Sequence, residues 1–69
     1  GVEISNSHIG PNVTIDAGSH VFNSKIVNSI VLTNVKIESS DIHDSTIGNF
    51  ASVKDAKGVL HIGDHSVVK

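Results

Sequence analysis

The sequence contains no cysteine, and it also lacks methionine, tryptophan and tyrosine. The absence of cysteine excludes disulfide bonds and thiolate metal sites, although it does not identify the redox compartment. With 69 residues the chain can form only one domain, and a domain of this size gains little stability from burial alone. We therefore expect a single domain, residues 1–69, that is stabilised by self-association or by docking on a larger body.

Charged and aromatic residues are scarce as well. Charged residues make up 17% of the chain, the net charge is −2, and the only aromatic residues besides histidine are Phe22 and Phe50. A nucleic-acid surface needs clustered Lys and Arg or stacking rings, so no nucleic-acid partner is expected. The longest apolar run, 30–32, is too short to cross a bilayer, and no membrane partner is expected. Because Gly1 opens directly into a repeat, no signal peptide and a cytoplasmic location are expected.

What the sequence does contain is an aliphatic residue at every fifth or sixth position. These positions are Ile4, Ile9, Ile15, Val21, Ile26, Val31, Ile37, Ile42, Ile47 and Val53. Two residues before each of them stands serine, alanine or valine, and never a large or charged residue. A period this short is typical of a solenoid and fits neither an amphipathic helix nor a hairpin protein.

The repeat sorts into three columns, with 16 or 17 residues per coil. The columns are Ile4/Val21/Ile37/Val53, Ile9/Ile26/Ile42/Ile62 and Ile15/Val31/Ile47/Val68. In this assignment residues 54–59 form a loop inserted at one corner. Because side chains two residues apart on a strand point to the same side, the aliphatic residue and its small partner both face the interior. The three-column register favours this arrangement over a four-sided pentapeptide-repeat helix.

The corners between the strands require left-handed backbone conformations, which glycine and asparagine adopt readily. We expect corners at Asn6, Asn12, Gly18, Asn23, Asn28, Asn34, Ser39, Asp44, Phe50 and His65. Phe50 and His65 are unusual residues for such positions, which marks them as sites of strain or of function.

The segments 9–14, 47–52 and 62–67 all begin with Ile-Gly and carry a small residue or valine at their fifth position. They resemble the hexapeptide repeat of left-handed parallel β-helices, and the resemblance covers essentially the whole chain. It implies left-handed coiling. The expected fold is therefore all-β: a left-handed parallel β-helix, a single-stranded solenoid of about four triangular coils of 16–17 residues.

The mixed rhythm of five and six residues, seen in 26–31 and 60–66, is similar to the C-terminal β-helix of sugar-phosphate nucleotidylyltransferases, particularly the long form of glucose-1-phosphate thymidylyltransferase. In that family a separate N-terminal α/β domain performs the chemistry, and the β-helix packs on it and on neighbouring subunits. The resemblance implies a fragment of a larger protein that acts as a structural and oligomerisation module, without activity or a cofactor of its own.

Apolar residues that face outward are expected to form a contact surface. Phe22, Val27, Ile30 and Leu32 lie outward on one coil, and the column assignment puts Val67 on the same face as Ile30 and Leu32. The expected partner is a second copy of the chain, with a trimer favoured, or an N-terminal catalytic domain. Scattered surface apolar residues, which are common in proteins, are the alternative.

Five histidines are many for a chain of 69 residues. His20 and His43 are candidate general bases if the chain is a small hexapeptide acyltransferase-type trimer, because that class uses a histidine in this role. Solvated outward histidines are the alternative. His61 and His65 are four residues apart but not on a helix, so no metal site is expected. A trimeric fibre or spike segment is the third functional possibility.

Two pairs of opposite charges are expected to stack on adjacent coils. They are Lys25 with Asp41 and Glu38 with Lys54. Such cross-strand pairs favour the correct register and contribute roughly 0.2–1 kcal/mol each.

Overall fold

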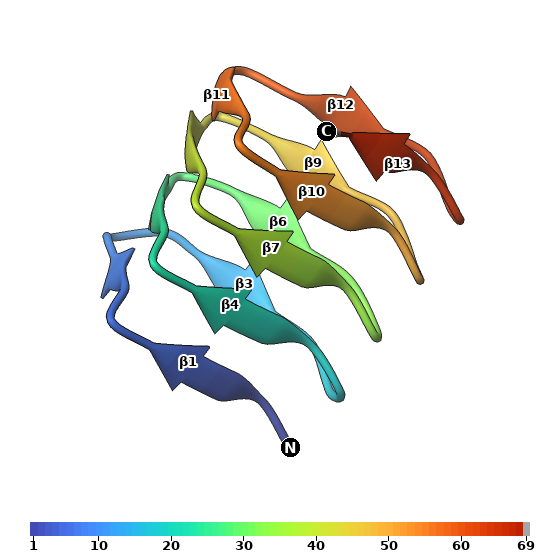
Figure 1. Ribbon diagram of the computed structural model, residues 1–69, viewed down its shortest axis with the longest axis horizontal. Coiled ribbons are helices and arrows are strands. Elements are labelled where there is room, and N and C mark those ends of the chain that lie inside the picture. The colour runs from blue at the N-terminus through green and yellow to red at the C-terminus, as the bar shows by residue number, and fades with distance from the viewer. Residues whose placement is uncertain (69) are drawn as a thin grey trace.

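The computed structural model describes residues 1–68 and shows thirteen short strands and no helix in that range. The strands form three parallel sheets, which are the three sides of a tube. Figure 1 shows the chain winding in successive coils, with the N- and C-termini at opposite ends of the stack. The predicted all-β parallel solenoid of about four coils is thus confirmed, while its left hand stays a prediction.

Each sheet takes one strand from every coil. The first sheet contains β1 (Glu3–Ser5), β4 (His20–Phe22), β7 (Lys36–Glu38), β10 (Ser52–Lys54) and β13 (Val67–Val68). The second sheet contains β2 (His8–Ile9), β5 (Lys25–Val27), β8 (Asp41–His43) and β11 (Lys57–Gly58). The third sheet contains β3 (Thr14–Ile15), β6 (Ile30–Val31), β9 (Thr46–Ile47) and β12 (His61–Ile62).

The interior of the tube is filled by stacked aliphatic side chains. In the second sheet, for example, Ile9 pairs with Ile26 and Ile26 pairs with Ile42. Because β-branched side chains stack well on a pleated surface, this register gives a continuous core. Residues of the two central coils, such as Ile26 and Ile42, are fully buried, whereas Ile4 in the first coil remains 45% exposed.

The last coil differs from the sequence-based assignment. Gly58 pairs with Ile42 in the second sheet, Ile62 pairs with Ile47 in the third, and Val68 pairs with Val53 in the first. The prediction of Ile62 in the second column, Val68 in the third and an inserted loop at 54–59 is therefore wrong. The last residue of the second column is a glycine, and a search for aliphatic residues at fixed spacing does not detect it.

The corners follow the predicted positions. All ten residues proposed as corners have positive φ angles, from 48° at Asn6 and Asp44 to 78° at Gly18. The last coil adds a corner at Asp55, with a φ of 54°, and Gly58, the last residue of β11, also has a positive φ, of 97°. A local left-handed backbone lets the chain turn between short strands, and asparagine tolerates it better than most residues.

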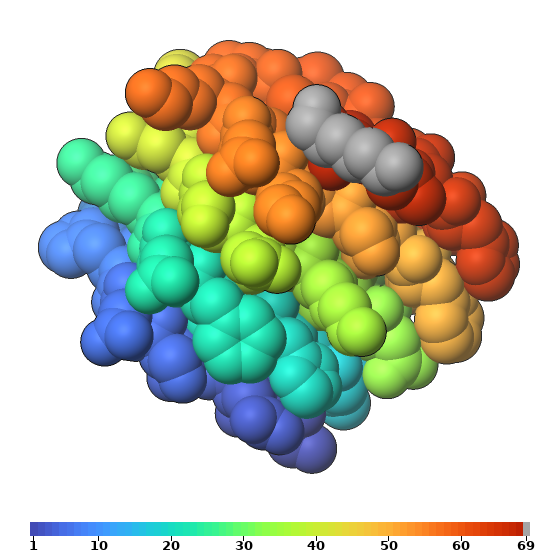
Figure 2. All heavy atoms as spheres, viewed as in Figure 1, coloured from blue at the N-terminus to red at the C-terminus, as the bar shows by residue number. Residues whose placement is uncertain are grey.

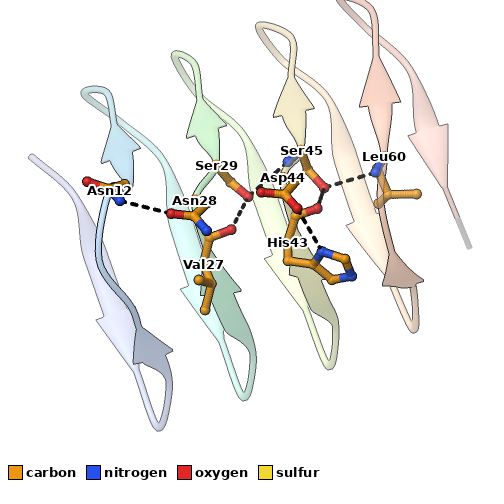
Figure 3. A network of polar contacts seen from close by, with 8 residues as sticks. All are labelled: Asn12, Val27, Asn28, Ser29, His43, Asp44, Ser45 and Leu60. Carbon is orange, nitrogen blue, oxygen red and sulfur yellow. Dashed lines mark hydrogen bonds and ion pairs between the residues drawn. The ribbon is translucent and has the colours of Figure 1, made fainter.

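Buried serines connect the coils at these corners. The Ser40 hydroxyl donates to the Glu38 carbonyl at 2.9 Å and accepts the N–H of Ala56 from the next coil at 3.2 Å. Ser45 makes the equivalent bonds to His43 and Leu60, as Figure 3 shows. Among the described residues no buried side-chain polar atom lacks a hydrogen-bond partner. The inward serines thus bond to the backbone at the turns, which removes the penalty for burying their hydroxyls.

Candidate functional site

The five predicted contact residues lie on different sides of the tube. Phe22 is on the first sheet, Val27 on the second, and Ile30 on the third, with Leu32 directly after the same strand. Val67 pairs with Ser52 on the first sheet, so its predicted place on the face of Ile30 and Leu32 is wrong. The structure therefore brings together only Ile30 and Leu32.

Two of these residues contact their own chain. A Cβ atom placed on Gly10 would lie 2.7 Å from Val27 Cγ2, which shows that Val27 packs over this glycine. The Phe22 ring lies 6.1 Å from the His20 ring, at an angle of 52°. Both Phe22 and Val27 are half-buried, whereas Ile30 is 47% exposed and Val67 is 64% exposed. Ile30 and Val67 thus expose the most apolar surface of the five.

The outer face of the third sheet, which we call the third-sheet face, has two parallel rows of side chains. The first row is Thr14, Ile30, Thr46 and His61, paired in that order across the strands. The second row is Asp16, Leu32, Gly48 and Gly63, whose first three members continue the ladder with backbone hydrogen bonds of 2.8–3.0 Å to the next coil. The two rows contain one carboxylate, that of Asp16, and no lysine. A second carboxylate, Asp64, lies against Gly48, where an added Cβ atom would be 2.7 Å from Asp64 Oδ1.

The other two sheets carry more charge outside. On the second sheet His8, Lys25, Asp41 and Lys57 stack in one row. On the first sheet Lys54 stacks on Glu38, and Lys36 lies beside His20. The predicted stacking of Lys25 with Asp41 and of Glu38 with Lys54 is confirmed, although neither pair lies within 4.0 Å in the described part of the chain.

Both candidate catalytic histidines lie beside a carboxylate. His43 Nδ1 is 3.3 Å from Asp44 Oδ2 at an exposed corner, as Figure 3 shows. His20 Nδ1 is 3.9 Å from Glu3 Oε1. At His43 the carboxylate within hydrogen-bonding distance of Nδ1 favours the tautomer that carries its proton there, which leaves Nε2 as the basic nitrogen.

The exposed corner next to His43 also contains a ladder of amide side chains. Asn12 Nδ2 donates to Asn28 Oδ1 at 3.0 Å, and Asp44 occupies the same corner position on the following coil. Figure 3 places these side chains in one row outside the serine ladder. The Asn12–Asn28 hydrogen bond joins the first coil to the second at this corner.

A stacked aromatic pair was not predicted from the sequence. The rings of Phe50 and His65 lie 5.1 Å apart, with an angle of 3° between their planes. Both residues are corners with a φ of 60°, and Phe50 is 54% exposed. The sequence marked both positions as unusual, but only the corrected last coil shows that they lie on the same corner. Stacking offsets part of the strain that a bulky residue has in this conformation.

A shallow groove of about 570 Å³ runs along the corner between the first and second sheets. Its lining includes Ser24 and Ser40 together with Asn23, Lys25 and Asp41. The lining alternates in charge along Lys25, Asp41 and Lys57, and it includes the imidazole ring of His8. In Figure 2 the coils form continuous bands of colour that pack directly on one another on the face in view.

Within residues 1–68 no group of three or more His, Cys, Asp or Glu side chains is arranged to bind a metal ion. His61 is on β12 and His65 is at the following corner, and His65 stacks on Phe50. The described part of the chain also contains no helix of the length and hydropathy that a membrane crossing requires.

The candidate sites thus reduce to three surfaces: the third-sheet face, the His43–Asp44 corner and the Phe50–His65 stack. Comparison of the chain with protein-family models, with curated proteins and with solved structures found no match.

Proposed function

We propose that this chain is a structural module that self-associates, as the β-helix does in sugar-phosphate nucleotidylyltransferase-like proteins, and that it performs no chemistry alone. One observation carries this proposal: a packed solenoid presents an exposed apolar residue, Ile30, on a face whose two outward rows contain one carboxylate, that of Asp16. Depletion of charge around exposed apolar residues is typical of protein–protein contacts. The partner is a second copy of the chain or, in a larger protein, a neighbouring catalytic domain.

Sedimentation velocity of the isolated chain tests the self-association. We expect a homo-oligomer for the wild type and a monomer for Leu32→Asp, because an aspartate at the contact would lose hydration without gaining a partner. Ser52→Asp is the matched control, since it adds the same charge on the first sheet and should leave the mass unchanged. A monomeric wild type would contradict the proposal.

An assay of nucleotidyl transfer tests the absence of independent chemistry. The isolated chain should give no turnover of a sugar phosphate with a nucleoside triphosphate. Turnover by the purified chain that co-elutes with the protein would refute a purely structural role.

A second candidate function is acyl transfer between subunits, and the contact of His43 with Asp44 at 3.3 Å favours it. In this alternative the Nε2 atom of His43 would remove a proton from the acceptor hydroxyl or amine. An assay with acetyl-CoA and small acceptors, with His43→Ala and His20→Ala as variants, decides the question. Activity that His43→Ala abolishes and His20→Ala retains would favour acyl transfer, whereas no activity in the wild type would reject it.

A further inference from the structure

We propose that the Phe50–His65 stack is a pH-sensitive clamp, which holds the last coil more firmly against the coil before it when His65 is protonated. Phe50 lies at the corner between β9 and β10, and His65 lies at the same corner one coil later, between β12 and β13. The clamp goes beyond the proposed self-association and does not depend on it, because neither residue belongs to the third-sheet face.

The first step is the geometry of the two rings. Their centroids lie 5.1 Å apart and their planes differ by only 3°, so the imidazole lies parallel to the face of the phenyl ring. The backbone supports this contact, because the His65 N–H donates to the Asn49 carbonyl at 2.8 Å. A cation within about 6 Å of the centroid of an aromatic ring is attracted by the negative charge of the ring face. The His65 ring is close enough for its own charge to change the contact.

The second step is the choice of residues at this corner. The same corner holds Gly18 and Asn34 in the earlier coils, and both residue types adopt a left-handed backbone at a lower cost than a bulky residue does. Phe50 and His65 each have a φ of 60° there, although both side chains are exposed and fill no part of the core. The fold thus does not require two rings at these positions, and backbone strain without a packing reason indicates a function.

The third step is the set of charges that surround His65. In the described part of the chain, carboxylates lie within 4.0 Å of His20 and His43 but not of His65. The neighbouring carboxylate, Asp64, accepts the N–H of Asn49 with its Oδ1 atom at 2.8 Å. The facing corner, residues 48–51, contains no titratable side chain. The phenyl ring is therefore the main group that distinguishes charged from neutral His65 at this corner.

The sign of the pH effect follows from these contacts. Histidine changes its charge between about pH 5 and 8, and the charged ring gains the attraction of Phe50 only while the last coil is folded onto its neighbour. In this range the folded state therefore binds more protons than the unfolded state does. The contribution of the stack to stability is present at acidic pH and is lost as the pH rises.

A double-mutant cycle on Phe50→Leu and His65→Gln, measured by chemical denaturation at about pH 5 and about pH 8, tests the clamp. Leucine removes the ring but keeps an apolar side chain, and glutamine keeps hydrogen-bonding groups without a charge. We expect the coupling, given as a ratio of unfolding equilibrium constants, to be about two- to fivefold larger at the lower pH. One protein concentration is used throughout, so that self-association enters all four variants alike.

The control cycle pairs Phe50→Leu with His61→Gln, because His61 lies on the outer face of the third sheet, paired with Thr46. Its coupling should be near zero at both pH values. Phe50→Tyr keeps an aromatic face and should retain the pH dependence. If Phe50→Leu does not fold, Phe50→Asn takes its place, since Asn34 occupies the same corner in the preceding coil.

A further variant separates the ring from the neighbouring carboxylate. Asp64→Asn removes the charge but keeps an oxygen that can accept the Asn49 N–H, and it should leave the pH dependence of the coupling intact. Loss of the pH dependence in this variant would assign it to the carboxylate and overturn the proposal.

A coupling that is equal at both pH values would also overturn the clamp and leave the stack with a purely structural role. A coupling that falls at acidic pH would overturn it too, because protonation would then weaken the contact. None of these outcomes affects the proposed self-association, which the mass of the particle tests separately.

Discussion

Single hydroxyl groups join neighbouring coils at the corners of the tube. The buried hydroxyls of Ser24, Ser29, Ser40 and Ser45 each donate to a carbonyl of their own turn and accept an N–H from the next coil, whereas Ser19 donates to the Leu32 carbonyl of the next coil. Serine is favoured here because alanine would leave the N–H of the next coil without an acceptor. The stability of the fold therefore depends on polar atoms as well as on the aliphatic core.

Ser40→Ala should lower the free energy of unfolding by about 1–3 kcal/mol, since it leaves the buried N–H of Ala56 unsatisfied. Chemical denaturation measures the change. Ser52→Ala, which removes an outward hydroxyl on the first sheet, should change the stability by less than about 0.5 kcal/mol. Equal effects of the two substitutions would show that the hydroxyl bond contributes nothing specific.

The corner at Ser39 is the second residue-scale case. Ser39 has a φ of 51°, whereas the same corner in the two preceding coils holds Asn6 and Asn23. Ser39→Asn should raise the free energy of unfolding by about 0.5–1 kcal/mol, because asparagine accepts this conformation at a lower cost. Ser5→Asn, within β1, should be neutral or destabilising, because asparagine is disfavoured in strands. A loss of stability in Ser39→Asn would contradict this account of the corner.

At the scale of strands, register is specified by both sides of each sheet. Inward columns of isoleucine and valine select one alignment, and outward charges such as Lys25, Asp41 and Lys57 favour the same one. A slip by one residue would place aliphatic side chains in water and charges in the core. The short strands, of two or three residues each, are thus held by their neighbours more than by their own length.

A double-mutant cycle on Lys25→Gln and Asp41→Asn should give a coupling free energy of about 0.2–1 kcal/mol. The coupling should fall at about 1 M salt, since both side chains are exposed and screened. The control cycle pairs Asp41→Asn with Lys36→Gln on the first sheet and should give a coupling near zero. A coupling that persists in high salt would indicate a contact other than the stacked charges.

As a whole, the molecule is a stack in which each coil contacts only the coils next to it. The core is fully buried in the middle coils and partly exposed at the ends, where Ile4 is 45% exposed. Stability in such an architecture grows with the number of coil–coil contacts. The free energy of unfolding should therefore rise with each coil that is added to the middle of the stack.

Duplication of residues 22–37 inserts one full coil, because Val21 pairs with Ile37. This variant should melt at least about 4 °C higher than the wild type, since one added central coil should supply more than about 1 kcal/mol. Duplication of residues 22–33 does not complete a coil and should give no increase. Thermal denaturation followed by circular dichroism distinguishes the two, and equal melting temperatures would contradict the stacked arrangement.

Much of the fold is predictable from the sequence because strand alternation and corner chemistry act locally. The inward columns through Val53 and the ten proposed corners agree with the structure. The last coil was misassigned because Gly58 provides no aliphatic signal at its column position. The surface was harder to predict, because it depends on the register of that coil. In the observed register Val67 lies on the first sheet, and the rings of Phe50 and His65 stack on each other.

The left-handed corners also have a chemical consequence. A positive φ is the natural conformation of a D-amino acid, for which the steric preferences of the backbone are mirrored. Exposed corners such as Asn23, Ser39 and Asp55 should therefore accept mirror-image residues by total synthesis without disturbing the strands between them. Because proteases cleave bonds between L-residues, such a chain would be protected at each turn that carries the change.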